Sequence, residues 1–352
     1  MNIGKDVIDQ IVSLLKREIA FAAYALPNLD DIEFIIDDNV SPVISSRKFI
    51  ISTWAGEKFE ISDRLNITEA RISPIQQISK SQFNRTSSSW EKYESAINKI
   101  TELLHTTEGK VVFSRLKVID DSRINFNLIA ESAVEMFTVH KGTFRAIYFT
   151  PSTGAWCICS PELLLEVDKG SGNFNTVALA GTRSGVTNDG WDDKNKREHN
   201  LVVRYISDTL SSLAISPEIL SSETMNAGKI QHILTRIHGN ISTPDGKIEI
   251  NDIIDALHPT PAISGYPVKW AKGVITQLET HDRECYGGYI AIDTDERYLA
   301  HVNLRCFAFE PGHCCFWGGG GIMKDSSAIS EWNESDMKME STMAFINKRL
   351  SK

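Results

Sequence analysis

The feature that most constrains the fold is a succession of short runs rich in β-branched and aromatic residues, which lie in adjacent groups along the chain. Such runs predict strands at 32–37, 48–54, 111–119, 144–150, 156–160, 177–180, 229–241, 286–293, 298–309 and 314–317. Helical spacing of apolar residues predicts helices at 6–21, 90–105, 193–213, 252–257, 268–280 and 327–350, and a polar stretch at 79–89 predicts a loop. Groups of strands punctuated by helices are typical of an α+β fold with large, mainly antiparallel sheets.

The overall charge limits the possible partners. The chain has 37 lysine and arginine residues against 46 aspartates and glutamates, which gives a formal net charge of −9. An acidic surface repels phosphate backbones, so we expect no nucleic-acid partner. If the substrate is an anion, its charge must be met by cations placed in the site itself or by a metal. The length of 352 residues allows one large domain or two of medium size.

Three further features indicate the compartment. Charged residues interrupt the first thirty residues, so we expect no signal peptide. No run approaches the roughly 18 apolar residues that a membrane span requires, so no membrane association is expected. The six cysteines form no C-x-x-C pair and lie mostly in apolar, strand-like runs, which favours buried free thiols over disulfides or zinc ligands. These features together predict a cytoplasmic protein.

Two predicted helices carry carboxylates in unusual positions. Glu198 falls on the apolar stripe of its helix, because it lies four and seven residues before other members of that stripe. In the last predicted helix, Glu331, Glu334 and Lys338 share one face. Helix periodicity alone favours solvated carboxylates at helix starts, where the macrodipole stabilises them. Two or three such carboxylates brought together would instead suit a hard cation such as Mg²⁺.

A run of four glycines, Gly318 to Gly321, follows a predicted strand and is flanked by Trp317 and Ile322. Four glycines expose backbone N–H groups and let a ligand approach the chain closely. The alternative is a flexible hairpin turn. The apolar flanks favour an anion-binding segment.

Arg305 lies in the middle of the predicted strand at 298–309, and alternation puts it on the side of Asn303 and Phe307. Its guanidinium is suited to bidentate binding of a carboxylate. A role for Arg305 in a structural salt bridge is equally consistent with its position in the sequence.

Five segments taken together resemble the motifs of chorismate-utilising enzymes. They are LAGTR at 179–183, NKREH at 195–199, LHPTPAISGYP at 257–267, GGGI at 319–322, and EWNE at 331–334 followed by Lys338. Each is weak alone, but five in the correct order with compatible intervals form a specific signal. The resemblance covers about 90–350, whereas residues 1–89 diverge. It implies one domain over 1–352, built from two mainly antiparallel sheets with helices packed outside.

Two further positions choose among the family's activities. The strand KVVFSR at 110–115 is similar to the one that carries the general base in water-using members, and SPELL at 160–164 resembles the segment of the general acid. The resemblance therefore implies that Lys110 is the base and Glu162 the acid of an isochorismate synthase. The reaction adds hydroxide at C2 of chorismate and expels the C4 hydroxyl, which requires a base and an acid on opposite sides.

The same resemblance implies a complete ligand set. Glu198 and Glu334 should hold Mg²⁺, with Glu331 close by, and the metal should bind the ring carboxylate near Lys338. The enolpyruvyl carboxylate should be held by Arg305, Tyr286 and backbone N–H groups of Gly319 and Gly321. His232 should lie near the enolpyruvyl ether, while Gly181 and Thr182 line the ring and Ala262 belongs to the same pocket.

Other interpretations stay open. Salicylate synthase shares the base and the acid, but Ala262 stands where the salicylate-forming pattern favours a hydroxyl-bearing residue. An inactive chorismate-binding scaffold is the alternative from another class. Asn195 replaces an acidic residue of the family, and Ser184-Gly185 replaces Pro-Arg. We expect a monomer without a glutaminase subunit, whose product serves menaquinone or siderophore synthesis.

Overall fold

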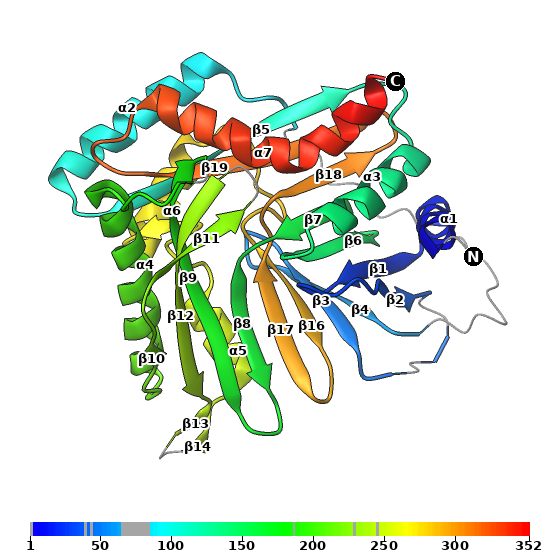
Figure 1. The fold of residues 1–352 in the computed structure, drawn as a ribbon, viewed down its shortest axis with the longest axis horizontal. Helices are drawn as coiled ribbons and strands as arrows, with labels where there is room; N and C mark the ends of the chain where they lie inside the picture. Colours follow the sequence, from blue (N-terminus) through cyan, green and yellow to red (C-terminus); the bar gives the residue numbers. More distant parts are fainter. Residues whose placement is uncertain are drawn as a thin grey trace.

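The computed structural model describes residues 3–38, 41–42, 45–64, 85–185, 187–227, 230–243 and 246–352. Two large antiparallel sheets pack face to face, and helices cover their outer faces (Figure 1). The predicted α+β fold with two mainly antiparallel sheets is therefore confirmed. The first part of the predicted loop (79–84) and the first residue of the predicted strand at 229–241 lie outside the described residues.

Sheet A has eight strands, and a long pair of them, β5 and β19, lies next to the short edge strand β15. Its spatial order is β15 (Gly265–Tyr266), β5 (Lys110–Asp120), β19 (His313–Ile322), β18 (Cys306–Glu310), β7 (Gly154–Ser160), β6 (Phe144–Thr150), β1 (Ala20–Ala25) and β2 (Glu33–Asp37). The β5–β19 pair brings the glycine run beside 112–115.

Sheet B has nine strands. Its spatial order is β10 (Glu218–Ile219), β12 (Ile230–Asn240), β9 (Asn173–Ser184), β8 (Leu163–Asp168), β17 (Arg297–Val302), β16 (Tyr289–Asp293), β3 (Lys48–Ser52) and β4 (Lys58–Ser62), and β11 (Glu223–Ala227) also pairs with β12. A small hairpin of β13 (Ser242–Thr243) and β14 (Gly246–Lys247) projects from it.

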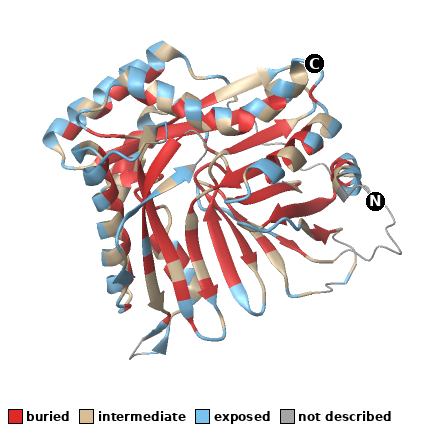
Figure 2. Ribbon diagram, in the orientation of Figure 1, coloured by how far each residue is buried: buried red, intermediate tan, exposed pale blue. Residues whose placement is uncertain are grey.

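The helices form the outer layers. They are α1 (Ile3–Lys16), α2 (Trp90–Thr106), α3 (Phe126–Val139), α4 (Asp193–Ser212), α5 (Ile250–Leu257), α6 (Val268–Leu278) and α7 (Ala328–Leu350). One apolar cluster joins α1, α3 and α7 to sheet A, and another joins α4 and α5 to sheet B. A third cluster fills the space between the sheets, so the strands are buried on both faces while the helices expose their outer sides (Figure 2).

Two helices show how local sequence sets these layers. In α2, the Ser89 side chain caps the first turn, and Tyr93, Ile97 and Ile100 are buried, whereas Leu103 is exposed. In α4, the N-cap Asp192 accepts a hydrogen bond from the backbone N–H of Asn195 at 2.8 Å. The buried stripe of α4 includes Glu198, so one carboxylate of this helix is directed toward the interior.

The N-terminal strands are part of both sheets. Strands β1 and β2 extend sheet A through β6, and strands β3 and β4 extend sheet B through β16. The part of the chain that carries no recognisable motif therefore pairs directly with the part that carries all of them. None of the helices in the described residues has the length and apolar character that crossing a bilayer requires.

The structure corrects several predicted elements. The first helix ends at Lys16 instead of 21, because the chain turns at Glu18 (φ 52°) into β1. In β1, Phe21 packs toward the outer helices and Tyr24 toward the other sheet. Both faces are therefore apolar, and the alternation that marks a half-exposed strand is missing. Helix α3 and strand β8 were not predicted.

Candidate active site

A pocket lies where β5, β9 and β19 approach α4 and α7. Eleven of the fourteen predicted site residues line it: Glu162, Gly181, Thr182, Glu198, His232, Ala262, Tyr286, Arg305, Gly319, Gly321 and Lys338. The other three, Lys110, Glu331 and Glu334, lie directly behind the lining.

Glu162 supplies the acidic group of the pocket. It stands between β7 and β8, its side chain is buried, and its backbone carbonyl accepts a hydrogen bond from the N–H of Val302. Burial raises the pKa of Glu162 to about 8, although the charges of Lys110 and Lys338 act in the opposite direction. At neutral pH this carboxyl therefore holds a proton that it can donate.

Lys110, the first residue of β5, is buried instead of lying at an exposed strand end. Its Nζ lies 2.8 Å from Oε1 of Glu198. Burial alone would raise the pKa of Glu198, but Lys110, followed by Lys338 and Lys194, holds that pKa below its usual value. The carboxylate of Glu198 is therefore an anion on the wall of the pocket.

The four glycines lie inside strand β19, whereas the predicted strand ended before them, and the alternative of a hairpin turn is also wrong. Their lack of side chains makes room for charged groups. A Cβ on Gly320 would lie 2.8 Å from Oε2 of Glu331 and 3.3 Å from Oε1 of Glu334. A Cβ on Gly321 would overlap Oε1 of Glu198. Three carboxylates therefore converge on two successive residues of β19.

Two more lysines neutralise the carboxylates of α7. Lys194 on α4 donates to Oε1 of Glu331 at 2.9 Å, and Lys338 donates to Oε1 of Glu334 at 2.7 Å. Lys338 also donates to the carbonyl of Gly319 at 2.9 Å. Burial and the nearby charge of Glu334 raise the pKa of Glu331. The two carboxylates therefore repel each other despite their lysine partners.

The opposite wall is built from His232 and its neighbours. Nε2 of His232 lies 3.3 Å from a guanidinium nitrogen of Arg305, and Nδ1 lies 3.3 Å from the carbonyl of Gly181 and 3.1 Å from Oγ1 of Thr182. Because arginine only donates, Nε2 must accept and Nδ1 must carry the proton. Burial and the nearby cations hold the pKa of His232 well below its usual value, so the ring is neutral.

Arg305 is not in the middle of a strand. The predicted strand at 298–309 is broken into β17 of sheet B and β18 of sheet A, and Arg305 stands at the crossing with φ 50°. The alternation used to orient its side chain does not apply there. No carboxylate among the described residues pairs with Arg305, so its guanidinium faces the pocket without an internal counter-ion.

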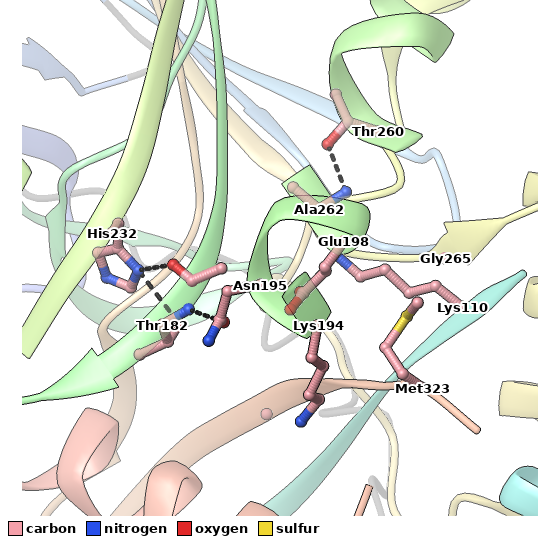
Figure 3. A network of polar contacts seen from close by, with 12 residues as sticks. Lys110, Thr182, Lys194, Asn195, Glu198, His232, Thr260, Ala262, Gly265 and Met323 are labelled. Atoms are coloured by element: carbon pink, nitrogen blue, oxygen red, sulfur yellow. Dashed lines mark hydrogen bonds and ion pairs between the residues drawn. The ribbon is translucent and has the colours of Figure 1, made fainter. Parts of the chain in front are cut away.

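Asn195 keeps a structural role although it replaces an acidic residue of the family. Its Oδ1 accepts from the backbone N–H of Thr182 at 2.9 Å, and its Nδ2 donates to Asp192 at 2.7 Å (Figure 3). The amide thus fastens the ring-lining segment at Thr182 to the start of α4. A carboxylate could also accept from Thr182 but could not donate to Asp192.

The carboxylate cluster has the donor chemistry that a divalent cation needs. As the side chains stand, no group of three or more His, Cys, Asp or Glu residues in the described part of the chain is arranged to hold a metal ion. Glu198, Glu331 and Glu334 nevertheless direct oxygens toward Gly320 and Gly321. Their repulsion is the kind that a hard cation relieves, and carboxylate oxygens are the ligands that Mg²⁺ prefers.

Lys194 was not among the predicted site residues, although it contacts Glu331 of the carboxylate cluster. Its only local signal is a cation in the first turn of a helix, where the macrodipole disfavours it. The buried free thiols, in contrast, are confirmed for all six cysteines.

The fold and the pocket define an enzyme that binds a small anionic molecule between two antiparallel sheets. A family model described as chorismate binding enzyme matches residues 49–347. The chain therefore belongs to the chorismate binding enzyme family, as its motifs predicted.

Individual relatives agree with this membership. Isochorismate synthase EntC of Escherichia coli K12 is 27% identical over 308 residues, which cover 82% of this chain and 72% of that protein. Isochorismate synthase MenF of Haemophilus influenzae is 31% identical over 226 residues, covering 60% of this chain and 50% of that protein. The solved structure of the menaquinone-specific isochorismate synthase MenF of Escherichia coli superposes with a TM-score of 0.76 at 18% identity, covering 96% and 90% of the two chains. At that identity the structural match establishes the fold alone.

Proposed function

We propose that this enzyme is an isochorismate synthase, which interconverts chorismate and isochorismate with Mg²⁺. One observation carries the proposal: a buried carboxyl with a pKa of about 8, Glu162, opens onto the same pocket as the Lys110–Glu198 ion pair. The names of the relatives support the same activity.

In the forward direction, Glu162 donates its proton to the C4 hydroxyl, which leaves as water. Lys110 removes a proton from the water that adds its oxygen at C2. The two conjugated ring double bonds then shift from C1=C2 and C5=C6 to C1=C6 and C4=C5 as the C4 oxygen leaves. One water enters and one leaves, so the reaction is an isomerisation without an oxidant or reductant. In the reverse direction the two residues exchange roles. To act as a base, Lys110 must first release to solvent the proton that it holds in the ion pair with Glu198. It must also turn from Glu198 toward the substrate, because a base needs hydrogen-bond reach.

The pocket wall offers groups for both substrate carboxylates. Arg305 has no carboxylate partner among the described residues, and its planar guanidinium suits the enolpyruvyl carboxylate, with Tyr286 and the N–H groups of Gly319 and Gly321 beside it. Lys338 would face the ring carboxylate. Neutral His232 orients Arg305 and would lie near the enolpyruvyl ether, while Gly181, Thr182 and Ala262 line the ring.

Glu198 and Glu334 would bind Mg²⁺, with Glu331 beside them. When bound, the cation would neutralise the ring carboxylate and withdraw electrons from the reacting ring.

The activity implies the protein's partners. Water is the nucleophile, so we infer that the enzyme works as a monomer without a glutaminase subunit. Six buried free thiols are in keeping with a reducing cytoplasm. Relatives include one named menaquinone-specific and one named vibriobactin-specific, so both pathways stay candidates for consuming the product.

Chromatographic analysis of the products from chorismate and Mg²⁺ tests the proposal. We expect a reversible mixture of chorismate and isochorismate with little pyruvate, and no anthranilate when ammonium is added. Salicylate with stoichiometric pyruvate would establish the salicylate synthase alternative. No turnover with or without Mg²⁺ would establish a non-catalytic chorismate-binding protein.

A further inference from the structure

Lys194 occupies a position that helix electrostatics disfavours. It is the second residue of α4, immediately after Asp193, where the positive end of the macrodipole repels a cation. Its ammonium reaches across to α7 and donates to Glu331 at 2.9 Å. Neither the acid–base pair nor the substrate-binding wall uses this side chain.

The ammonium of Lys194 adjoins all three carboxylates of the proposed metal site. Its partner Glu331 and the neighbouring Glu334 both border the position that a Cβ on Gly320 would take, and Glu198 borders Gly321. Figure 3 shows that Lys194 and Glu198 both come from α4. One ammonium group therefore stands at the edge of the whole carboxylate cluster.

Solvent exposure separates Lys194 from the other two lysines of the site. The side chain of Lys194 is 32% exposed, whereas that of Lys338 is 16% exposed and that of Lys110 only 1%. Lys338 is further held by the carbonyl of Gly319. Within the described residues, Glu331 is the partner recorded for Lys194, and Ser326 also donates to that carboxylate at 2.7 Å. Lys194 can therefore swing into solvent and leave Glu331 with one remaining donor.

The balance of charges in the cluster suggests when Lys194 would move into solvent. Glu198, Glu331 and Glu334 are matched by three ammonium groups, so the cluster is neutral in the metal-free protein. A divalent cation placed among the carboxylates would repel Lys194. With Lys194 in solvent, the cation and the two enclosed lysines leave a net positive site, which suits an anionic substrate.

We propose that Lys194 is an exchangeable internal counter-ion, which pairs with the carboxylate cluster in the metal-free protein and is displaced by the divalent cation. This inference rests on the proposed metal site of Glu198, Glu331 and Glu334. Lys194 then has two effects: it keeps α4 and α7 together before metal binds, and it weakens metal binding because the two cations compete.

The test measures metal binding without substrate. Mn²⁺ serves as a spectroscopic probe and Mg²⁺ is titrated by calorimetry, with the full chain. We expect Lys194→Met to bind either ion more tightly, by roughly fivefold or more, and to unfold at a lower temperature than wild type when metal is absent. Lys194→Arg should restore weak binding. The matched control is Lys196→Met, which removes the same charge from an exposed position on the same helix.

The possible results distinguish a failure of the Lys194 inference from a failure of the proposed metal site. If Lys194→Met binds no more tightly than Lys196→Met, or binds more weakly than wild type, Lys194 is no competitor and the inference is overturned, while the metal site stands. If wild type binds neither ion, or if Glu334→Gln leaves binding unchanged, the proposed metal site fails and the inference fails with it. A melting curve of each metal-free variant identifies any that does not fold.

Discussion

Nζ of Lys110 lies 2.8 Å from Oε1 of Glu198, so the proposed general base and a proposed metal ligand form one buried ion pair. Lys110 is not itself a proposed metal ligand, but its positive charge compensates the negative charge of Glu198, which is one. Breaking a buried pair leaves an uncompensated charge, which costs several kcal/mol. The proposed base and the proposed metal site are therefore coupled electrostatically, so a substitution at Lys110 should change metal binding.

We predict that Lys110→Met loses turnover in both directions, by about 10²–10⁴-fold. Methionine keeps most of the volume but cannot accept a proton. Since Glu198 loses its counter-ion, binding of Mg²⁺ should become tighter. Coupled assays in each direction and calorimetric titration measure the two effects, with Lys117→Met on the same strand as control. Near-normal rates would show that the base lies elsewhere; His232 is a poor substitute, because its Nε2 accepts from Arg305.

Glu162 should make both activity and stability depend on pH. Forward turnover requires the protonated carboxyl, so it should fall as pH rises through about 8. Glu162→Gln should be inactive, because the amide cannot deliver the proton.

The sign of the stability effect follows from proton binding. An unfolded glutamate has a pKa of about 4.3, so between that value and about 8 the folded state holds a proton that the unfolded state has lost. The free energy of unfolding should therefore fall as pH rises through this window. Denaturant unfolding at several pH values should give a flatter profile for Glu162→Gln than for wild type or for the control Glu340→Gln. Equal profiles for all three would contradict a raised pKa.

Glu198→Gln and Glu334→Gln should each weaken Mg²⁺ binding by about tenfold or more, because each removes an anionic oxygen from a hard cation. Calorimetric titration measures the change. Glu340→Gln alters an exposed carboxylate on α7 and should bind Mg²⁺ like wild type. Unchanged magnesium dependence in the first two variants would mean that both residues are ordinary helix-start carboxylates.

Gly321→Ala tests the clearance that β19 provides. The added Cβ would overlap Oε1 of Glu198 and lie 2.8 Å from Cε of Lys110. We expect a destabilisation of about 1–3 kcal/mol, as is usual for overpacking, and loss of both metal binding and turnover. Gly190→Ala, where no atom lies within 4 Å, is the control and should leave melting temperature and activity unchanged. Full activity in Gly321→Ala would show that the ion pair can move aside without consequence.

Much of the fold could be predicted because most strands here are short apolar runs with clear limits. The prediction of strand limits failed where one continuous apolar segment contributes a strand to each of the two sheets. The chain at 298–309 has continuous strand propensity, but its halves pair with different sheets, and the turn at Arg305 between them is fixed by that long-range pairing. Strand β1 was missed for a related reason, because both of its faces are covered.

Most of the predicted site residues line one pocket, because they lie within motifs whose residues come together in the fold, but their individual roles stay predictions. What motifs do not convey is how charges compensate one another. The Lys194–Glu331 and Lys110–Glu198 pairs join residues 137 and 88 positions apart, so only the packing of α4, α7 and β5 reveals them. The glycine run likewise lies at the pocket, but the predicted strand ended too early. Local sequence does not reveal that these positions must be glycine because carboxylates from other elements crowd the strand.

The strands β1 to β4 give the N-terminal part of the chain a protective role. Without them, β6 and β16 would become open edges of the two sheets, each with a row of unpaired N–H and C=O groups. Such edges recruit strands from other molecules. A fragment that begins at α2 would contain every predicted catalytic residue and still be expected to aggregate. We therefore expect that the catalytic part of this enzyme does not fold well by itself, and that fusion or truncation should leave these strands intact.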